Sequence, residues 1–173
     1  TVTRNWYGIV VGAGPSGDNL ITGNNIVKND YYGLVLYETV NNTIYHNNFI
    51  ENKKQQASTY IKTSNTLDNN YPSGGNYWSD YTGIDLCSGP YQNLTGSDDI
   101  GDTSYIIDQN NVDHYPLMNP WPHTPPVINV NATVDICPQT LNLRSEGKWV
   151  TAYIELPKGY NVSDIDATTI LLN

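Results

Sequence analysis

The feature that most constrains the fold is an internal repeat in the first third of the chain. Residues 19–26 (NLITGNNI) align with residues 42–49 (NTIYHNNF), 23 positions further on, and residues 7–11 (YGIVV) align with residues 32–36 (YGLVL), 25 positions further on. This period is too short for a propeller blade, and the apolar residues lack the period of helical repeats. Short β-branched runs separated by Asn and Gly instead indicate the coils of a parallel β-helix.

The asparagines of the repeat have a defined place in such a fold. Stacking brings equivalent residues of successive coils into register, so asparagines at the corners can form amide ladders while alternate strand residues fill the interior. Each coil buries its faces only against a neighbour. Because the sequence opens inside a repeat, we expect the natural protein to extend N-terminally, or Thr1 to be a processed end.

Composition limits the classes of partner. Eight Lys and Arg against 17 Asp and Glu give a formal charge of −9, which repels phosphate backbones, so we expect no nucleic-acid partner. Apolar runs fall well short of the roughly 18 residues of a membrane span, so we expect no direct membrane insertion. Fourteen Tyr and abundant Asn indicate a folded, β-rich chain with an uncharged polar surface, which suits an extracellular or cell-surface location.

The motif NTIYHNNFIEN at residues 42–52 resembles the right-handed parallel β-helix repeats of prokaryotic, above all archaeal, surface proteins, a group called NosD-like or carbohydrate-binding and sugar-hydrolase repeats. Three segments between residues 76 and 117 are similar to sequences that commonly end such β-helices. The resemblance implies an all-β fold. Residues 1–73 would form its terminal coils, and residues 74–119 would form a loop-rich cap with many Asp and aromatic residues.

The remainder of the chain changes character twice. Prolines in residues 120–129 predict an extended, semi-rigid linker. Alternating apolar residues in residues 130–173 predict three strands with one buried face, and this segment is similar to small β-sandwich modules of prokaryotic surface proteins. Three short strands leave open edges. We therefore expect either further strands beyond the C-terminus or self-association and strand exchange with a partner chain.

Seven aspartates and no Lys or Arg lie between residues 74 and 118. Glycine-containing, Asp-rich loops favour Ca²⁺, which takes about six to eight oxygen ligands. We therefore predict a structural calcium ion in the cap. Its expected ligands are Asp98, the carbonyl of Ile100, Asp102, and Asp108 or Asp113. The alternative is that each of these aspartates accepts hydrogen bonds from backbone amides of its own turn.

Other chemistries have weaker support in the sequence. His46, His114 and His123, with Met118, are the residue types that bind copper, but they are scattered over a repeat, a loop and a linker. We therefore do not expect a copper site. No spacing marks a pair of carboxylates for glycoside hydrolysis or a nucleophile with its base, so a non-enzymatic role is favoured.

Several side chains are candidates for modification or ligand contact. The two cysteines are predicted to form a Cys87–Cys137 disulfide in an oxidising compartment, with two unpaired thiols as the alternative. Four sequons predict N-glycosylation at Asn41, Asn93, Asn131 and Asn161. Four aromatic residues are candidates for stacking on sugar rings, although packing is the commoner role of such residues in strands: Tyr32, Tyr37, Tyr45 and Trp78.

Together these features predict an extracellular structural or adhesive protein of a cell surface or filament. Its predicted ligand is a polysaccharide, and its cap is expected to be stabilised by calcium. The alternative is a fragment of a β-helical carbohydrate-active enzyme, a polysaccharide hydrolase or lyase, whose catalytic coils lie outside this sequence.

Overall fold

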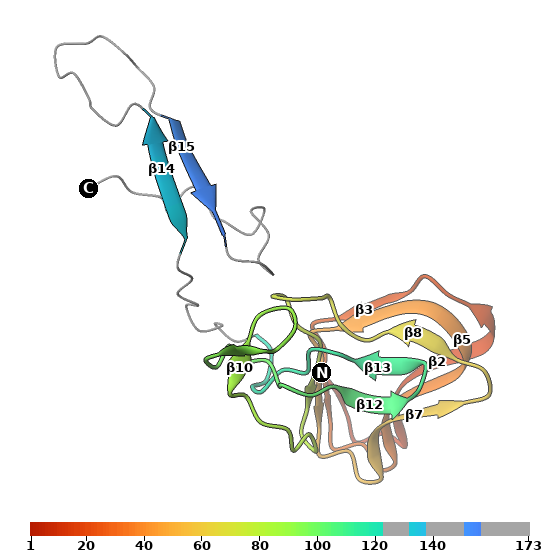
Figure 1. The fold of residues 1–173 in the computed structure, drawn as a ribbon. Helices are drawn as coiled ribbons and strands as arrows, with labels where there is room; N and C mark the ends of the chain where they lie inside the picture. The colour runs from red at the N-terminus through yellow and green to blue at the C-terminus, as the bar shows by residue number, and fades with distance from the viewer. Residues whose placement is uncertain (123–131, 138–150, 157–173) are drawn as a thin grey trace. The chain divides into compact units, whose positions relative to one another are not determined.

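The structure is a computed structural model that describes residues 1–122, 132–137 and 151–156, with only the backbone of residues 13–16. It divides into two compact units, Thr1–Val127 and Ile128–Asn173. All regular elements of the described ranges are β-strands (Figure 1), so those ranges hold no helix long and apolar enough to cross a membrane. The predicted all-β class is confirmed.

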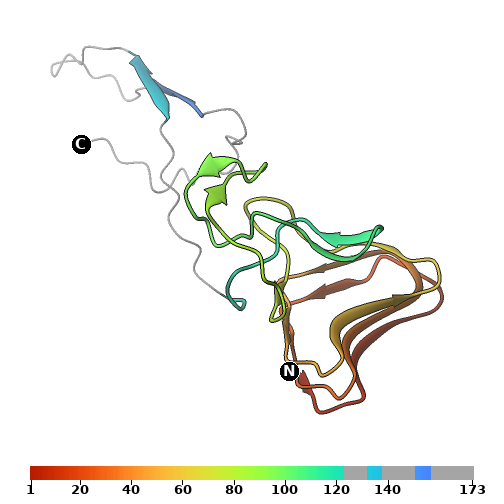
Figure 2. The ribbon, with the colours of Figure 1, turned by 60° about the horizontal axis from the view of Figure 1, so that its bottom comes forward.

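The first unit is a parallel β-helix whose stacked coils have a triangular outline (Figure 2). One face is a sheet in which every neighbouring pair of strands is parallel, in the order β1 (Val2–Thr3), β4 (Asn25–Val27), β6 (Asn48–Ile50) and β9 (Tyr77–Trp78). The other two faces share the long strand β5 (Tyr32–Tyr45), which bends from one face to the next. The parallel β-helix predicted from the repeat is therefore confirmed.

The strands that flank β5 complete these two faces. On the second face the first part of β5 lies between β2 (Tyr7–Ser16) and β7 (Gln55–Tyr60), parallel to both. On the third face the last part of β5 lies between β3 (Leu20–Thr22) and β8 (Ser64–Thr66), again parallel to both. The register pairs Tyr7 with Tyr32 and Leu20 with Thr43, which follows the repeat read from the sequence.

Several corners of the coils combine a left-handed residue with an asparagine that directly follows it. Lys28 and Glu51, 23 positions apart, have φ angles of 54° and 50°, and each is followed by an asparagine, Asn29 or Asn52. The left-handed residue turns the chain sharply, and the next side chain points into the stack. Left-handed residues also precede Asn5, Asn19, Asn24, Asn42 and Asn47.

These asparagines form three hydrogen-bonded ladders along the stack. In each step the backbone N–H and the side-chain N–H of one asparagine donate to the Oδ1 of the asparagine in the next coil; for Asn42 and Asn65 the distances are 3.1 and 2.8 Å. Buried polar groups are costly unless they are paired, and the ladders pair them repeatedly. The ladders run through Asn5, Asn29 and Asn52; Asn19, Asn42 and Asn65; and Asn24, Asn47 and Asn76.

The interior of the coils is apolar and narrow. It is filled by Val11, Ile26, Leu34, Leu36, Ile44, Phe49, Ala57, Leu67 and Trp78. At the last coil the ring of Trp78 is stacked between Phe49, at a centroid distance of 4.4 Å, and Tyr105, at 4.3 Å. An aromatic stack thus continues the core into the cap.

The cap leaves the coils after β9 and later returns to them. It contains two antiparallel pairs, β10 (Cys87–Ser88) with β11 (Leu94–Thr95) and β12 (Tyr105–Asp108) with β13 (Asn111–Asp113). On its return the chain places Asn111 and Asp113 at the ends of two asparagine ladders, and Leu117 forms a parallel bridge with Tyr77. Residues 111–117 therefore supply a last, partial coil.

The second unit is described only in part. β14 (Thr133–Cys137) pairs antiparallel with β15 (Thr151–Glu155). The third predicted strand of this segment lies outside the described residues, as does most of the predicted linker. Trp121, at the start of that linker, is fixed to the coils: its N–H donates to Asn48 Oδ1 at 2.7 Å, and its ring stacks on His46 at 3.6 Å.

Candidate functional site

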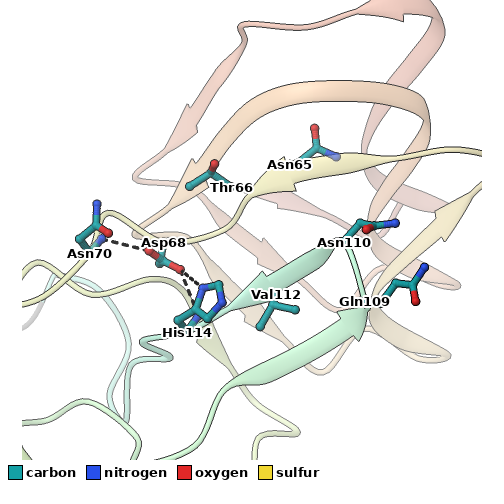
Figure 3. A pocket seen from close by; sticks show the side chains of 8 residues that line it. All are labelled: Asn65, Thr66, Asp68, Asn70, Gln109, Asn110, Val112 and His114. Atoms are coloured by element: carbon teal, nitrogen blue, oxygen red, sulfur yellow. Dashed lines mark hydrogen bonds and ion pairs between the residues drawn. The ribbon is translucent and has the colours of Figure 1, made fainter. Parts of the chain in front are cut away.

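A polar pocket of about 300 Å³ lies between the third coil and the returning cap segment (Figure 3). This volume is at the lower end of the roughly 300–1,000 Å³ found for small-molecule sites. The lining is mostly amide and hydroxyl groups, with one imidazole and one carboxylate: Asn65, Thr66, Asp68, Asn70, Gln109, Asn110, Val112 and His114. Such a lining suits a small polar ligand better than an apolar one.

The pocket exists because β8 and β13 meet at two points and leave a gap between them. At one end Asn65 N–H donates to the Asn110 carbonyl at 3.4 Å. At the other end His114 N–H donates to Asp68 Oδ2 at 3.1 Å. Thr66 lies between these contacts on the coil side, and Val112 lies between them on the cap side (Figure 3).

Asp68 holds the imidazole of His114 in place. The Asp68 side chain is only 6% exposed, whereas that of His114 is 64% exposed. Asp68 Oδ2 accepts a hydrogen bond from His114 Nδ1 at 2.9 Å, and Oδ1 accepts one from Asn70 N–H at 3.1 Å. With its proton on Nδ1, the neutral imidazole leaves Nε2 as an acceptor. The described residues provide no hydrogen bond to Nε2.

The opposite end of the pocket carries side chains available to a ligand. Gln109 and Asn110 form the turn of the β12–β13 hairpin and are exposed. Their side-chain amides, like the hydroxyl of Thr66, have no hydrogen-bond partner among the described residues. These groups offer both donors and acceptors, as a sugar hydroxyl requires.

The structure corrects the predicted calcium site. Asp98 is buried and accepts hydrogen bonds from the N–H groups of Gly89 and Ile100, at 3.2 and 3.1 Å. Asp102 accepts from the N–H groups of Leu86 and Cys87, at 3.1 and 3.0 Å. Burial raises the pKa of Asp98 above its usual value, against these hydrogen bonds.

The remaining predicted ligands are engaged in the same way. Asp108 accepts hydrogen bonds within its own turn, from Asn110 N–H at 2.7 Å and from Asn111 Nδ2 at 2.9 Å. Ile100 is buried and bridges to Leu117. Within the described ranges no group of three or more His, Cys, Asp or Glu side chains is placed to hold a metal ion. The prediction of structural calcium is therefore wrong, and the aspartates act as acceptors for backbone amides.

Asp113 differs from the other predicted ligands because its side chain ends in the core, surrounded by hydrogen-bond donors. It is fully buried and accepts hydrogen bonds from Asn76 N–H at 2.7 Å, Trp78 Nε1 at 2.9 Å and Tyr115 N–H at 3.1 Å. Burial raises the pKa of Asp113 to about 7, and these donors oppose the rise. Asp113 therefore ends a ladder and anchors the cap to the core.

The four aromatic residues predicted to contact sugar differ in their exposure to solvent. Trp78 is 1% exposed and Tyr32 is 4% exposed, so neither ring has a free face for a sugar, and both predictions are corrected. Tyr37 is 40% exposed, and Tyr45 is partly exposed and packs edge-on against His46. For Tyr37 and Tyr45 contact with a sugar stays a prediction.

The cysteines and sequons are described only in part. Cys87 and Cys137 belong to different compact units, so their disulfide is not tested and stays a prediction. Asn41 is exposed at a corner of the coils, and Asn93 is exposed in the cap. Asn131 and Asn161 lie outside the described residues. Glycosylation at all four positions stays a prediction.

Sequence reasoning did not identify the pocket. It considered His114 only as a copper ligand, and it gave no role to Thr66, Gln109 or Asn110. Thr66 lies more than 40 positions before Gln109, Asn110 and His114, and only the return of the cap to the third coil brings it close to them. The one available signal was the resemblance of residues 111–117 to a β-helix ending, which places His114 beside the last coil.

The coils match one known protein family. Residues 1–83 match the family described as periplasmic copper-binding protein (NosD), a family of parallel β-helices. Comparison with curated proteins and with solved structures found no match. The periplasmic location in the family's description confirms the prediction that this chain is located outside the cytoplasm.

The described residues do not fit the copper ion in that family's description. His46 Nε2 is 2.8 Å from the Ser73 carbonyl and its ring stacks on Trp121, while His114 is held by Asp68. His123 lies outside the described ranges, and inside them no three His, Cys, Asp or Glu side chains converge. The relation is thus one of fold: residues 1–83 are NosD-like parallel β-helix coils.

Proposed function

We propose that this protein is a non-enzymatic, polysaccharide-binding module of a cell surface, and that the pocket beside His114 binds one sugar residue of the polymer. The observation that carries the proposal is the lining of the pocket: free amide and hydroxyl groups at one end and an imidazole fixed by Asp68 at the other. Sugar hydroxyls both donate and accept hydrogen bonds, and this lining offers partners of both kinds.

The scaffold supports such a role. Thr66 and Asn65 belong to a strand of the coil stack, and Asn65 is held on both sides by ladder bonds to Asn42 and Asn111. Sites on rigid strands are more precisely ordered than sites on free loops, so less conformational entropy is lost on binding. A stack of coils that presents one face to a polymer also suits an adhesive or filament protein of prokaryotic, including archaeal, surfaces.

The chemistry of the pocket favours binding over catalysis. Hydrolysis of a glycosidic bond normally uses two carboxyl groups about 5–10 Å apart. Asp68 is the single carboxyl group of the lining, and its oxygens are engaged by Asn70 and His114. An imidazole held through Nδ1 presents its Nε2 to a sugar hydroxyl, and no second acid of the lining stands ready to protonate a glycosidic oxygen.

The proposal is tested by calorimetry with a panel of neutral oligosaccharides. The variants Thr66→Ala and Asn110→Ala each remove one ligand-facing group and should weaken binding about 3- to 10-fold, the effect of one neutral hydrogen bond. Thr22→Ala is the matched control, because Thr22 is an exposed threonine at the end of β3. Its affinity should equal that of the unmodified protein.

Two results would contradict the proposal. One is the absence of binding to every oligosaccharide of a panel that covers common hexoses, pentoses and amino sugars. The other is binding that Thr66→Ala and Asn110→Ala leave unchanged. Release of reducing ends from a bound oligosaccharide would instead favour the carbohydrate-active enzyme.

A further inference from the structure

A second cluster of side chains, on the coils and separate from the pocket, combines aromatic rings with one lysine. It consists of Trp6, Tyr7, Tyr31, Tyr32, Lys54 and Tyr60. Corresponding rings of successive coils stack: Trp6 lies on Tyr31 at a centroid distance of 5.0 Å, and Tyr7 lies on Tyr32 at 6.0 Å. We call this set the tyrosine–lysine cluster.

Lys54 is the cation of the cluster and has no acidic partner among the described residues. Its Nζ donates to the hydroxyl of Tyr31 and lies 4.2 Å from the centre of that ring. The acids of the neighbouring corners are occupied: Asp30 pairs with Lys53 at 2.6 Å and Glu51 pairs with Lys28 at 3.3 Å. The hydrogen bond to Tyr31 raises the pKa of Lys54 above its usual value, so the ammonium group remains charged.

The hydroxyl groups around Lys54 add further donors. Tyr60 donates to the Tyr32 hydroxyl at 3.0 Å, and this bond together with the ammonium of Lys54 lowers the pKa of Tyr32 to about 8. The Tyr31 hydroxyl accepts from Lys54, so its own hydrogen remains available. An ammonium group beside phenol hydroxyls attracts an anion with several acceptor oxygens.

The surroundings permit an anion despite the negative net charge of the chain. Residues 1–73 contain five Lys and Arg and five Asp and Glu, whereas residues 74–122 contain seven Asp and no Lys or Arg. Most of the acidity therefore belongs to the cap, and the coils are neutral. Trp6 is 60% exposed and stacks on Tyr31, the ring that the ammonium of Lys54 contacts, so it offers an apolar surface near the charge. A charged group carried on a sugar ring matches both features.

We propose that the tyrosine–lysine cluster binds the carboxylate of an acidic polysaccharide, with Lys54 as its ionic contact and Trp6 as the surface for the adjoining sugar ring. This deepens the proposed polysaccharide-binding function by naming an acidic polymer as the substrate class, and it uses residues that do not line the pocket.

The test compares a polyuronate, polygalacturonate, with its methyl-esterified form at pH 6.5, where the hydroxyl of Tyr32 is protonated. Lys54→Gln should weaken binding to polygalacturonate about fivefold or more and leave binding to the ester unchanged. Lys53→Gln is the matched control, since it removes the same charge one position earlier from a lysine paired with Asp30. Its effect should stay below about twofold.

Two further variants separate charge from shape. Lys54→Arg keeps a cation and should retain the preference for the polyuronate over its ester. Lys54→Met keeps the stem against the rings, which protects folding, and should lose that preference as Lys54→Gln does. Equal weakening by Lys53→Gln and Lys54→Gln would show general charge attraction and overturn the proposal, as would full affinity in Lys54→Gln.

The proposals for the pocket and for the tyrosine–lysine cluster are tested by different experiments, so one can be contradicted without the other. Thr66→Ala and Asn110→Ala report on the pocket through neutral oligosaccharides, while Lys54→Gln reports on the cluster through the difference between acid and ester. Loss of the first effect alone removes the pocket from the proposed function. Loss of the second alone removes only the acidic specificity.

Discussion

Asn65 donates its side-chain N–H to Asn111 Oδ1 at 2.9 Å across 46 positions of the chain. That separation is twice the 23-residue spacing of the ladder from Asn19 to Asn65, so the cap returns to the stack in register after a detour. The bond joins the last full coil to the segment that carries Asp113 and His114. The same return stabilises the end of the β-helix and forms one wall of the pocket.

The asparagine ladders are expected to contribute strongly to stability. Asn47→Ala removes the acceptor of the backbone and side-chain N–H groups of Asn24 and leaves Asn76 Oδ1 with the backbone N–H of residue 47 alone, and each unsatisfied buried group costs about 1–3 kcal/mol. Urea unfolding should show a lower free energy of unfolding by about 2–4 kcal/mol. Asn93→Ala, at an exposed position of the cap, should stay within about 0.5 kcal/mol. Equal effects of the two substitutions would contradict the role of the ladders.

Asp113 should make stability depend on pH. Its pKa is about 7 when folded, against about 3.9 for an unperturbed aspartate, so the folded state holds a proton that the unfolded state releases between these values. The contribution is fully present below about pH 4 and is lost as the pH rises to about 7. The melting temperature of the unmodified protein minus that of Asp113→Asn should therefore be higher at pH 5 than at pH 8. If this signed difference rises with pH, the raised pKa of Asp113 is contradicted.

Removal of calcium should leave the cap intact. The carboxylates of Asp98, Asp102 and Asp108 are engaged by N–H donors of the chain itself. Melting temperatures in excess calcium and in excess chelator should therefore agree. A higher melting temperature in calcium, lost in Asp98→Asn, would restore the metal that the structure argues against.

Trp121 is expected to fix the end of the first unit to the coils. Its backbone N–H and carbonyl both bond to the side chain of Asn48, and its ring stacks on His46. Trp121→Ala should increase cleavage by a nonspecific protease just beyond Met118, because the segment loses the stacking on His46 and keeps only the backbone bonds to Asn48. Trp6→Ala removes an exposed indole elsewhere and should leave that cleavage unchanged.

The repeat predicted the coils well because their register depends on local spacing. The 23-residue lag places Asn42 over Asn19 and Asn47 over Asn24 whatever the rest of the chain does. The calcium site was mispredicted because an Asp-rich loop has the same composition whether its carboxylates accept from backbone amides or bind a metal. Trp78 was mistaken for a sugar contact because sequence does not show that Tyr105 covers its ring.

The pocket could not be predicted for a related reason. Its walls depend on where residues 111–117 rejoin the stack after the detour through β10, β11 and β12. A period in the sequence predicts stacking only while the repeat continues. The contacts of Asn65 with Asn110 and of Asp68 with His114, which leave the gap between them, follow from tertiary packing alone.

Binding of a sugar in the pocket beside His114 is measured most directly by backbone and side-chain amide NMR during titration with an oligosaccharide that the protein binds. The largest shifts are expected at Thr66, Gln109, Asn110 and His114, with shifts at Thr22 and Asn93 near zero. Binding that leaves the signals of Thr66, Gln109, Asn110 and His114 unmoved would contradict the account.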